Sequence, residues 1–292
     1  MWEEKARNLL EGAVDFHVHT GPDVFPRIVS DIEVARQAKE WKMRAVLIKS
    51  HVTITADRAK IASQQTQFDV FGGLALNYPV GGLNIHAVDI AINLGAKEIW
   101  MPTFQSAHYL KNVTHVPMFA KILPVGLKGI TILNERNKIK DELRPILEKI
   151  AESGIVLGTG HLSVEESMIL VREAKKIGVT KIVVTHPLAP FINFTVQEMK
   201  DIISEGTTML EHNFNDCTHQ VSHPILPLVI AQAIKEIGAQ HCILGSDGGQ
   251  VINPLPREMM LKFITEMLKA GISTEEIKMM VSENPKKMLG ID

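Results

Sequence analysis

Cysteine is nearly absent from the sequence, since Cys217 and Cys242 are the only two in 292 residues. Two cysteines cannot build a disulfide framework, and without a CxxC pair they offer no thiolate zinc site. We interpret both as packing residues. With 45% hydrophobic residues, the chain can instead bury a large core.

An excess of charge of one sign is also missing, because 31 Lys and Arg residues stand against 33 Asp and Glu. A net charge of −2 gives no drive toward nucleic acid or an anionic membrane, so neither partner is expected. The partner that we expect is a small-molecule substrate, and a homo-oligomer stays open.

Long hydrophobic runs are missing too, because no stretch reaches 18 uninterrupted apolar residues. The beginning of the chain, MWEEKARNLLEGA, is acidic and lacks the apolar region of a signal peptide. The expected location is therefore cytoplasmic. Nucleotide-binding GxGxxG and GK[ST] motifs are absent as well, so we set a nucleotide cofactor aside.

Eight short β-type runs are present, and most are followed by a helical pattern. Several are apolar throughout, which is typical of parallel strands covered on both faces. Eight such units predict an α/β fold, a (β/α)8 TIM barrel, as a single domain over residues 1–292. The runs lie near Val14–His17, Arg44–Lys49, Val70–Leu76, Glu98–Met101, Ile155–Gly158, Lys181–Thr185, Thr208–Glu211 and Cys242–Gly245.

Helix starts are marked by a capping-box spacing, in which Glu follows Ser or Thr after three residues. The pairs are Ser30 and Glu33, Ser163 and Glu166, Thr195 and Glu198, and Ser273 and Glu276. One long irregular stretch, Pro102–Lys140, predicts an insertion between strands 4 and 5 that could wall or cover a site.

Four histidines and one aspartate share a single placement at the ends of apolar runs. His17 and His19 stand in AVDFHVHT, His161 in IVLGTGH, His186 in KIVVTHP and Asp247 in CILGSDGG. The carboxyl ends of parallel strands converge on one mouth, and residues two apart in a strand share a face. Imidazole and carboxylate ligands together suit zinc, manganese, iron or nickel, so the set predicts a divalent metal site.

The motifs DFHVHTG, GTGHLS, VVTHP and GSDGG, in this order, resemble the metal-dependent amidohydrolase superfamily. Its barrels carry HxH after strand 1, His after strands 5 and 6, and Asp after strand 8, and the ending SENPKKMLGI is similar to the tail of many members. The resemblance implies that His17 and His19 bind a metal, most often zinc, with His161 or His186 and Asp247 completing or lining the site. Which of the two histidines is a ligand stays open.

Binuclear members carry a carboxylated Lys or a Glu at the exit of strand 4, where this chain has WMPT. Lys128 and Glu211 are the nearest substitutes, but they lie in the insertion and on strand 7. We therefore expect one metal per chain.

His51 in VLIKSHVT resembles the second-strand histidine of the polymerase-and-histidinol-phosphatase phosphoesterases, although Ser50 stands where an acid belongs. It is a candidate second-site ligand or substrate contact. Other polar residues at strand exits are candidate substrate contacts: Lys49, His108 and Glu211.

These features predict an enzyme, a hydrolase in which a metal-activated water attacks a C–N or ester bond of a small polar substrate. Asp247 would be the general base, and His161 would stabilise charge or shuttle protons. A phosphoesterase, a decarboxylase or lyase on the same barrel, and a metal-dependent binding protein remain as alternatives.

Overall fold

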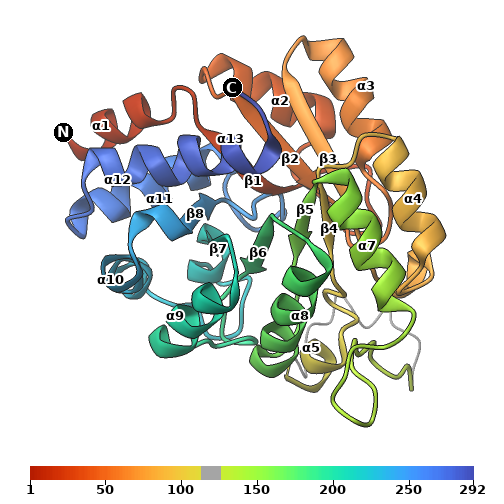
Figure 1. The fold of residues 1–292 in the computed structure, drawn as a ribbon. Coiled ribbons are helices and arrows are strands. Elements are labelled where there is room, and N and C mark those ends of the chain that lie inside the picture. The colour runs from red at the N-terminus through yellow and green to blue at the C-terminus, as the bar shows by residue number, and fades with distance from the viewer. Residues whose placement is uncertain (113–125) are drawn as a thin grey trace.

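The computed structural model describes residues 1–112 and 126–292 as an eight-stranded parallel barrel (Figure 1). The strands follow chain order around the barrel, and all observed pairings are parallel. Their bounds are β1 Val14–His19, β2 Ala45–Lys49, β3 Asp69–Ala75, β4 Glu98–Trp100, β5 Val156–Gly158, β6 Ile182–Thr185, β7 Met209–Asn213 and β8 Cys242–Gly245. The predicted fold class and all eight predicted strands are confirmed.

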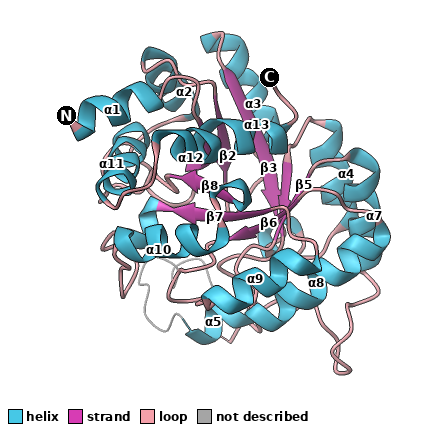
Figure 2. Cartoon of the chain, turned by 60° about the vertical axis from the view of Figure 1, so that its left-hand side comes forward, coloured by secondary structure: helices cyan, strands magenta, loops and turns pink. Residues whose placement is uncertain are grey.

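Helices surround this barrel and cover its outer face (Figure 2). They are α1 Trp2–Leu9, α2 Asp31–Glu40, α3 Ala56–Thr66, α4 Ile85–Asn93, α5 Ala107–Asn112, α7 Leu143–Ser153, α8 Val164–Ile177, α9 Val196–Glu205, α10 Pro227–Ile237, α11 Pro256–Lys269, α12 Thr274–Lys278 and α13 Asn284–Leu289. A π-helical turn, Met279–Glu283, joins α12 to α13. Among the described residues, none of these helices combines the length and the apolar character that crossing a bilayer requires.

The four predicted capping boxes all form, at the starts of α2, α8, α9 and α12. In each, the Ser or Thr side chain accepts the backbone N–H of the Glu, whose carboxylate accepts the N–H of the cap residue. The insertion begins with α5 and includes a tight turn in which Asn134 N–H donates to the Lys138 carbonyl at 2.8 Å. Residues 113–125 of the insertion lie outside the described part of the chain.

The described residues form three apolar clusters, one between strands and helices, one inside the barrel and a small one of Phe25, Val52, Phe104 and Tyr109. The cluster inside the barrel fills its amino-terminal end with residues near the starts of the strands, such as Val14, Ala45 and Val156. Met288 and Leu289 of α13 pack against them, so a helix closes this end. The carboxyl end of the barrel holds the buried histidines beside the small aromatic cluster.

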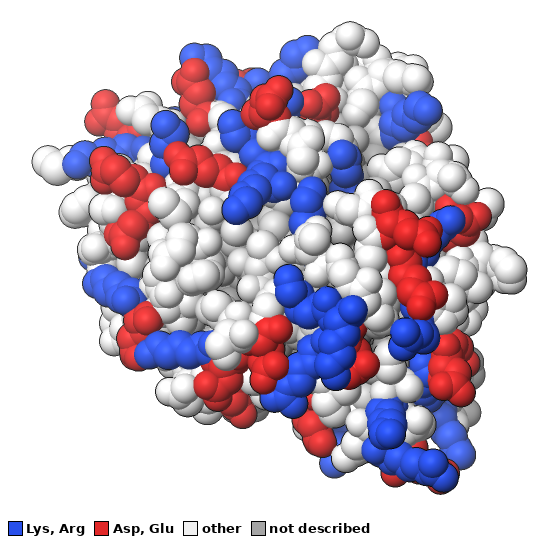
Figure 3. All heavy atoms as spheres, in the orientation of Figure 1, with Lys and Arg blue, Asp and Glu red and all other residues white. Residues whose placement is uncertain are grey.

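The outer surface carries both signs of charge side by side on the face drawn in Figure 3. Interspersed charges of opposite sign produce only a weak long-range field, as the small net charge of −2 also indicates.

Replacing Met288 with Ala should lower the free energy of unfolding by about 2–5 kcal/mol, because the side chain is 1% exposed and its loss leaves a cavity under the barrel. Urea unfolding measures the change. Lys287→Ala, on the exposed side of the same helix, is the control and should stay near wild type. Equal stability of both variants would show that α13 does not hold the barrel closed.

Candidate metal centre

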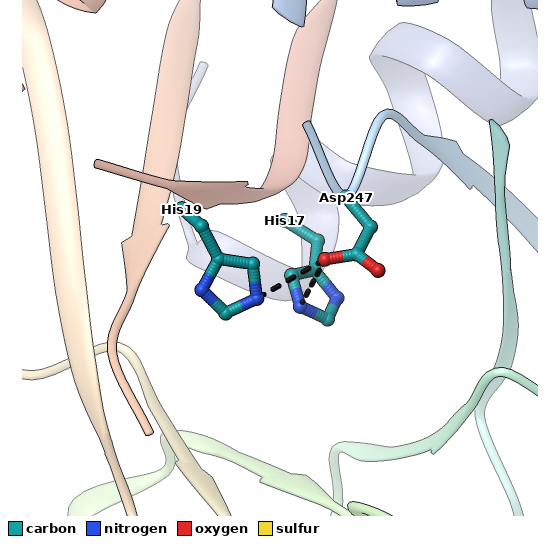
Figure 4. Close-up of side chains that lie close together, drawn as sticks. All are labelled: His17, His19 and Asp247. Carbon is teal, nitrogen blue, oxygen red and sulfur yellow. Dashed lines mark ion pairs between the residues drawn. The ribbon is translucent and has the colours of Figure 1, made fainter. Parts of the chain in front are cut away.

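A β-bulge in β1 turns both histidines of the HVH motif toward the barrel interior. The register with β2 shifts between Asp15 and Val18, while Phe16 packs inside the barrel and Val18 packs among the helices. A bulge adds one residue and reverses the alternation of side chains that follows. His17 therefore points inward directly after Phe16, and His19 follows it on the same side (Figure 4).

The two imidazoles meet the carboxylate of Asp247, which comes from the loop after β8 (Figure 4). Asp247 Oδ1 lies 3.1 Å from His19 Nε2 and 3.4 Å from His17 Nε2. One ligand atom from each residue lies within 4.8 Å of the others, and all three residues are buried. His186 Nε2, from the end of β6, lies 3.7 Å from Asp247 Oδ2.

The far side of these groups is held by a second layer of polar partners. His17 Nδ1 lies 2.9 Å from Glu211 Oε1, His186 Nδ1 lies 3.1 Å from Asp216 Oδ2, and Asn215 Nδ2 donates to Asp247 Oδ2 at 2.9 Å. Ligating histidines almost always engage a carboxylate or carbonyl with the nitrogen that does not bind the metal. In contrast, His17 Nε2 and Asp247 Oδ1 make no hydrogen bond within the described residues, although both are buried. These orphaned atoms face a common point, so the donor set fits a divalent metal ion.

Burial keeps most of these imidazoles neutral, which is the form that binds metals. Desolvation lowers the pKa of His17, His19 and His161 well below the usual value. Burial also acts to lower the pKa of His186, but the charge of Asp216 and its hydrogen bond outweigh burial and raise it. A metal would therefore compete with protonation more strongly at His186 than at His17 or His19.

Unusual backbone conformations occur at two of these positions. His186 has φ 53° and Asp247 has φ 45°, both in the left-handed region. Such strain in residues other than glycine is concentrated at functional sites. Nearby, Gly249 has φ 117°, and a Cβ there would lie 1.7 Å from the His19 carbonyl oxygen, so only glycine lets the β8 loop pass this close to β1.

A cavity of about 80 Å³ opens beside this cluster and is lined in part by His161 and His51. Neither ring nitrogen of His161 has a hydrogen-bond partner among the described residues, and its ring lies 5.5 Å from that of His186. His51 stacks on His19 at 4.7 Å, and its Nδ1 lies 2.9 Å from Thr103 Oγ1. Both histidines border the same space as the cluster.

The other proposed substrate contacts do not line this cavity. Lys49 and Glu211 are fully buried beneath the cluster, where Glu211 holds His17. His108, on α5, donates from Nε2 to the Phe191 carbonyl at 2.7 Å and so supports the cavity wall from behind. Lys128 is exposed, away from the cluster.

Two partners of the cluster, Arg27 and Asp216, escaped the sequence analysis, whereas Asn215 was expected among the polar residues of the barrel mouth. Arg27 Nη2 lies 3.4 Å from His19 Nδ1 and is held by Asp23. Asp216 sits in the polar run NFNDC after β7, next to the strand that ends at His186, and this adjacency was the one available signal. Arg27 has no comparable signal, because its contact depends on how the β1–α2 loop folds back.

Solved structures share this fold over nearly the whole chain. An amidohydrolase from Pseudomonas aeruginosa is 12% identical, with a TM-score of 0.64 and coverage of 99% of this chain and 98% of its own. The probable dipeptidase PvdM from Pseudomonas aeruginosa is 11% identical, with a TM-score of 0.62 and coverage of 99% and 98%. A dihydroorotase is 12% identical, with a TM-score of 0.58 and coverage of 97% and 71%.

The chain thus has the fold of amidohydrolase-superfamily TIM barrels, with a cluster at the barrel mouth that could bind a metal. No curated protein matches its sequence. A family model does match, over residues 12–210, and the chain belongs to that family, DUF6282, a family of unknown function.

Replacing Glu211 with Gln should weaken metal binding by about 10–100-fold, because the neutral amide lowers the basicity of the His17 imidazole that it orients. Competition with a chromogenic chelator measures the affinity of the metal. Glu135→Gln, on the exposed turn of the insertion, is the matched control. An unchanged affinity in a folded Glu211 variant would contradict a metal site that includes His17.

Proposed function

We propose that this protein is a metal-dependent hydrolase that cleaves a C–N or ester bond in a small polar substrate. The observation that carries the proposal is the convergence of His17 Nε2 and His19 Nε2 on Asp247 Oδ1 at 3.4 and 3.1 Å, beside a cavity. Its neighbours in fold, an amidohydrolase, a probable dipeptidase and a dihydroorotase, support hydrolysis of this kind.

His17, His19, His186 and Asp247 would hold the ion, which we propose to be zinc, with manganese, iron and nickel as alternatives. When bound, a divalent ion supplies an ionised water near neutral pH and a Lewis acid for a carbonyl oxygen. Asp247 accepts the proton of the attacking water and passes it to the leaving group. Asn215 fixes its Oδ2, so the carboxylate is oriented while Oδ1 stays unpaired.

Among the candidate site histidines, His161 is the one best placed to contact the substrate. It lines the cavity and both of its ring nitrogens lack partners among the described residues, unlike those of His17 and His186. A neutral imidazole can donate a hydrogen bond to the carbonyl oxygen, on which negative charge develops during attack. We therefore assign His161 to stabilisation of the substrate oxygen.

A single ion is proposed because β4 supplies no bridging group. The strand ends at Trp100, whose indole ring lies 6.2 Å from the ring of His17 and fills the barrel interior. Binuclear members of the amidohydrolase superfamily carry a bridging carboxylated Lys or a Glu at this strand end. A cytoplasmic location is part of the same proposal.

The purified protein should contain about one equivalent of divalent metal per chain. Elemental analysis by mass spectrometry measures the stoichiometry, before and after dialysis against zinc or manganese. Two equivalents would require further ligands, with His51 the first candidate. Protein that stays metal-free after loading would overturn the proposal.

Replacing Asp247 with Asn should reduce turnover by about 10²–10⁴-fold, since the amide cannot accept the proton. Metal should stay bound through the three histidine Nε2 atoms. A panel of small amides, lactones, esters and phosphoesters provides the assay, and turnover of phosphoesters alone would favour a phosphoesterase. Asp201→Asn, on the exposed face of α9, is the control. Full turnover in metal-replete Asp247→Asn protein would remove Asp247 from the chemistry.

A further inference from the structure

Arg27 is the one arginine or lysine among the described residues that line the cavity. It lies in the loop between β1 and α2, and its backbone forms an antiparallel bridge with Gln250 of the β8 loop. The neighbouring Ile28 N–H donates to the Gly249 carbonyl at 2.9 Å. The side chain is 6% exposed, so the guanidinium is a fixed part of the wall and not a solvated surface charge.

The contacts of Arg27 with Asp23 occupy one edge of the guanidinium. Asp23 Oδ2 accepts from Nε at 3.1 Å and from Nη2 at 3.0 Å, which is the edge that these two nitrogens share. The opposite edge is formed by Nη1 and the second hydrogen of Nη2, and Nη1 has no hydrogen-bond partner among the described residues. An arginine edge of this kind matches the two oxygens of a carboxylate.

The remaining hydrogen of Nη2 points to His19 Nδ1 at 3.4 Å, a contact that requires a lone pair on that nitrogen. A metal held by His19 Nε2 requires the proton to be on Nδ1. The imidazole then no longer accepts from Arg27. The whole edge would become free for an anion beside the metal cluster.

Part of the cavity wall is aromatic. Tyr109 and Phe191 line it with ring centroids 5.1 Å apart, and Phe191 also lies 4.9 Å from His161. The same two side chains line an outer compartment of about 110 Å³, together with Gln220 and Val221. Planar or apolar groups bind well against such a wall, and space continues outward for them.

The carboxylates of the cavity do not compete for the arginine. Asp216 is paired with His186, and Asp247 faces the histidine cluster and Asn215. Arg27 is therefore the group in the described wall that can donate a pair of charge-assisted hydrogen bonds to an incoming anion.

We propose that the cavity binds a small carboxylate with an aromatic or apolar body, its carboxylate on the free edge of Arg27 and its body against Tyr109 and Phe191. This rests on the proposed function in that the same cavity holds the substrate. The substrate class is then an amide or ester with a free carboxylate a few bonds from the carbonyl that is attacked, since Arg27 touches His19.

Isothermal titration calorimetry with phenylacetate and its neutral isostere phenylacetamide tests the proposal on the full chain, as purified and after chelation. Phenylacetate should bind about tenfold more tightly, as expected for a charge-assisted pair of hydrogen bonds. Arg27→Gln should abolish this preference, whereas Arg36→Gln, on the exposed face of α2, should retain it. Equal binding of the two ligands to wild type, or a preference that persists in folded Arg27→Gln, overturns the proposal.

Arg27→Gln removes the cation that Asp23 pairs with, so Arg27→Lys provides a second variant. It keeps the positive charge but loses the two parallel N–H donors of the guanidinium. Its preference should fall several-fold, and an unchanged preference would count against the proposal. Phe191→Ala should weaken phenylacetate but not acetate. On chelated protein His19 Nδ1 can accept from Arg27 again, so the preference should be smaller there than on metal-loaded protein, because Nη1 alone is free. Binding to the chelated protein is independent of turnover, so silence across the activity panel would defeat the hydrolase and leave this inference standing.

Discussion

The junction between β1 and β8 is the constraint on which the site depends. The barrel closes there through the His19 N–H bond to the Gly248 carbonyl at 2.8 Å and the Ser246 N–H bond to Asp15 Oδ1 at 2.8 Å. The bulge in β1 lies in the same place. Because the bulge reverses the alternation of side chains along β1, this one strand supplies apolar side chains to the closed end of the barrel and two imidazoles to the open end. The contacts that close the fold therefore also set the distance between the HVH motif and Asp247.

Much of this arrangement could be predicted because its signals are local. Eight apolar runs and four capping boxes specify strands and helix starts within a few residues, and each helix follows the strand it covers. The order of His17, His19, His161, His186 and Asp247 at strand ends then places them at one mouth. The bulge itself leaves no mark in the sequence, since simple alternation would put Phe16 and His17 on opposite faces.

The residues that were missed depend on contacts between loops. Arg27 reaches His19 because the β1–α2 loop pairs with the β8 loop. His108, which was expected as a substrate contact, instead donates to the carbonyl of Phe191, 83 positions away. No periodicity encodes such contacts. Of the polar residues expected at the mouth, Lys49 and Glu211 lie beneath the histidines, whereas His51 does line the cavity. Aromatic side chains and Arg27 also contribute to the wall.

Lys49 places a positive charge among the buried side chains beneath the histidines. Its ammonium makes no hydrogen bond among the described residues and lies 4.9 Å from the Trp100 ring. Burial lowers the pKa of Lys49, against the opposing charges of Glu211 and Asp247. Burial likewise raises the pKa of Glu211 to about 7, against the charges of His186 and Lys49. A buried charge is tolerated when an opposite charge compensates it, so each group stabilises the ionised form of the other. The Glu211 carboxylate in turn favours a proton on His17 Nδ1, which leaves the lone pair of that ring on Nε2, where a metal would bind. By keeping Glu211 ionised, the Lys49 ammonium helps to hold His17 in this form.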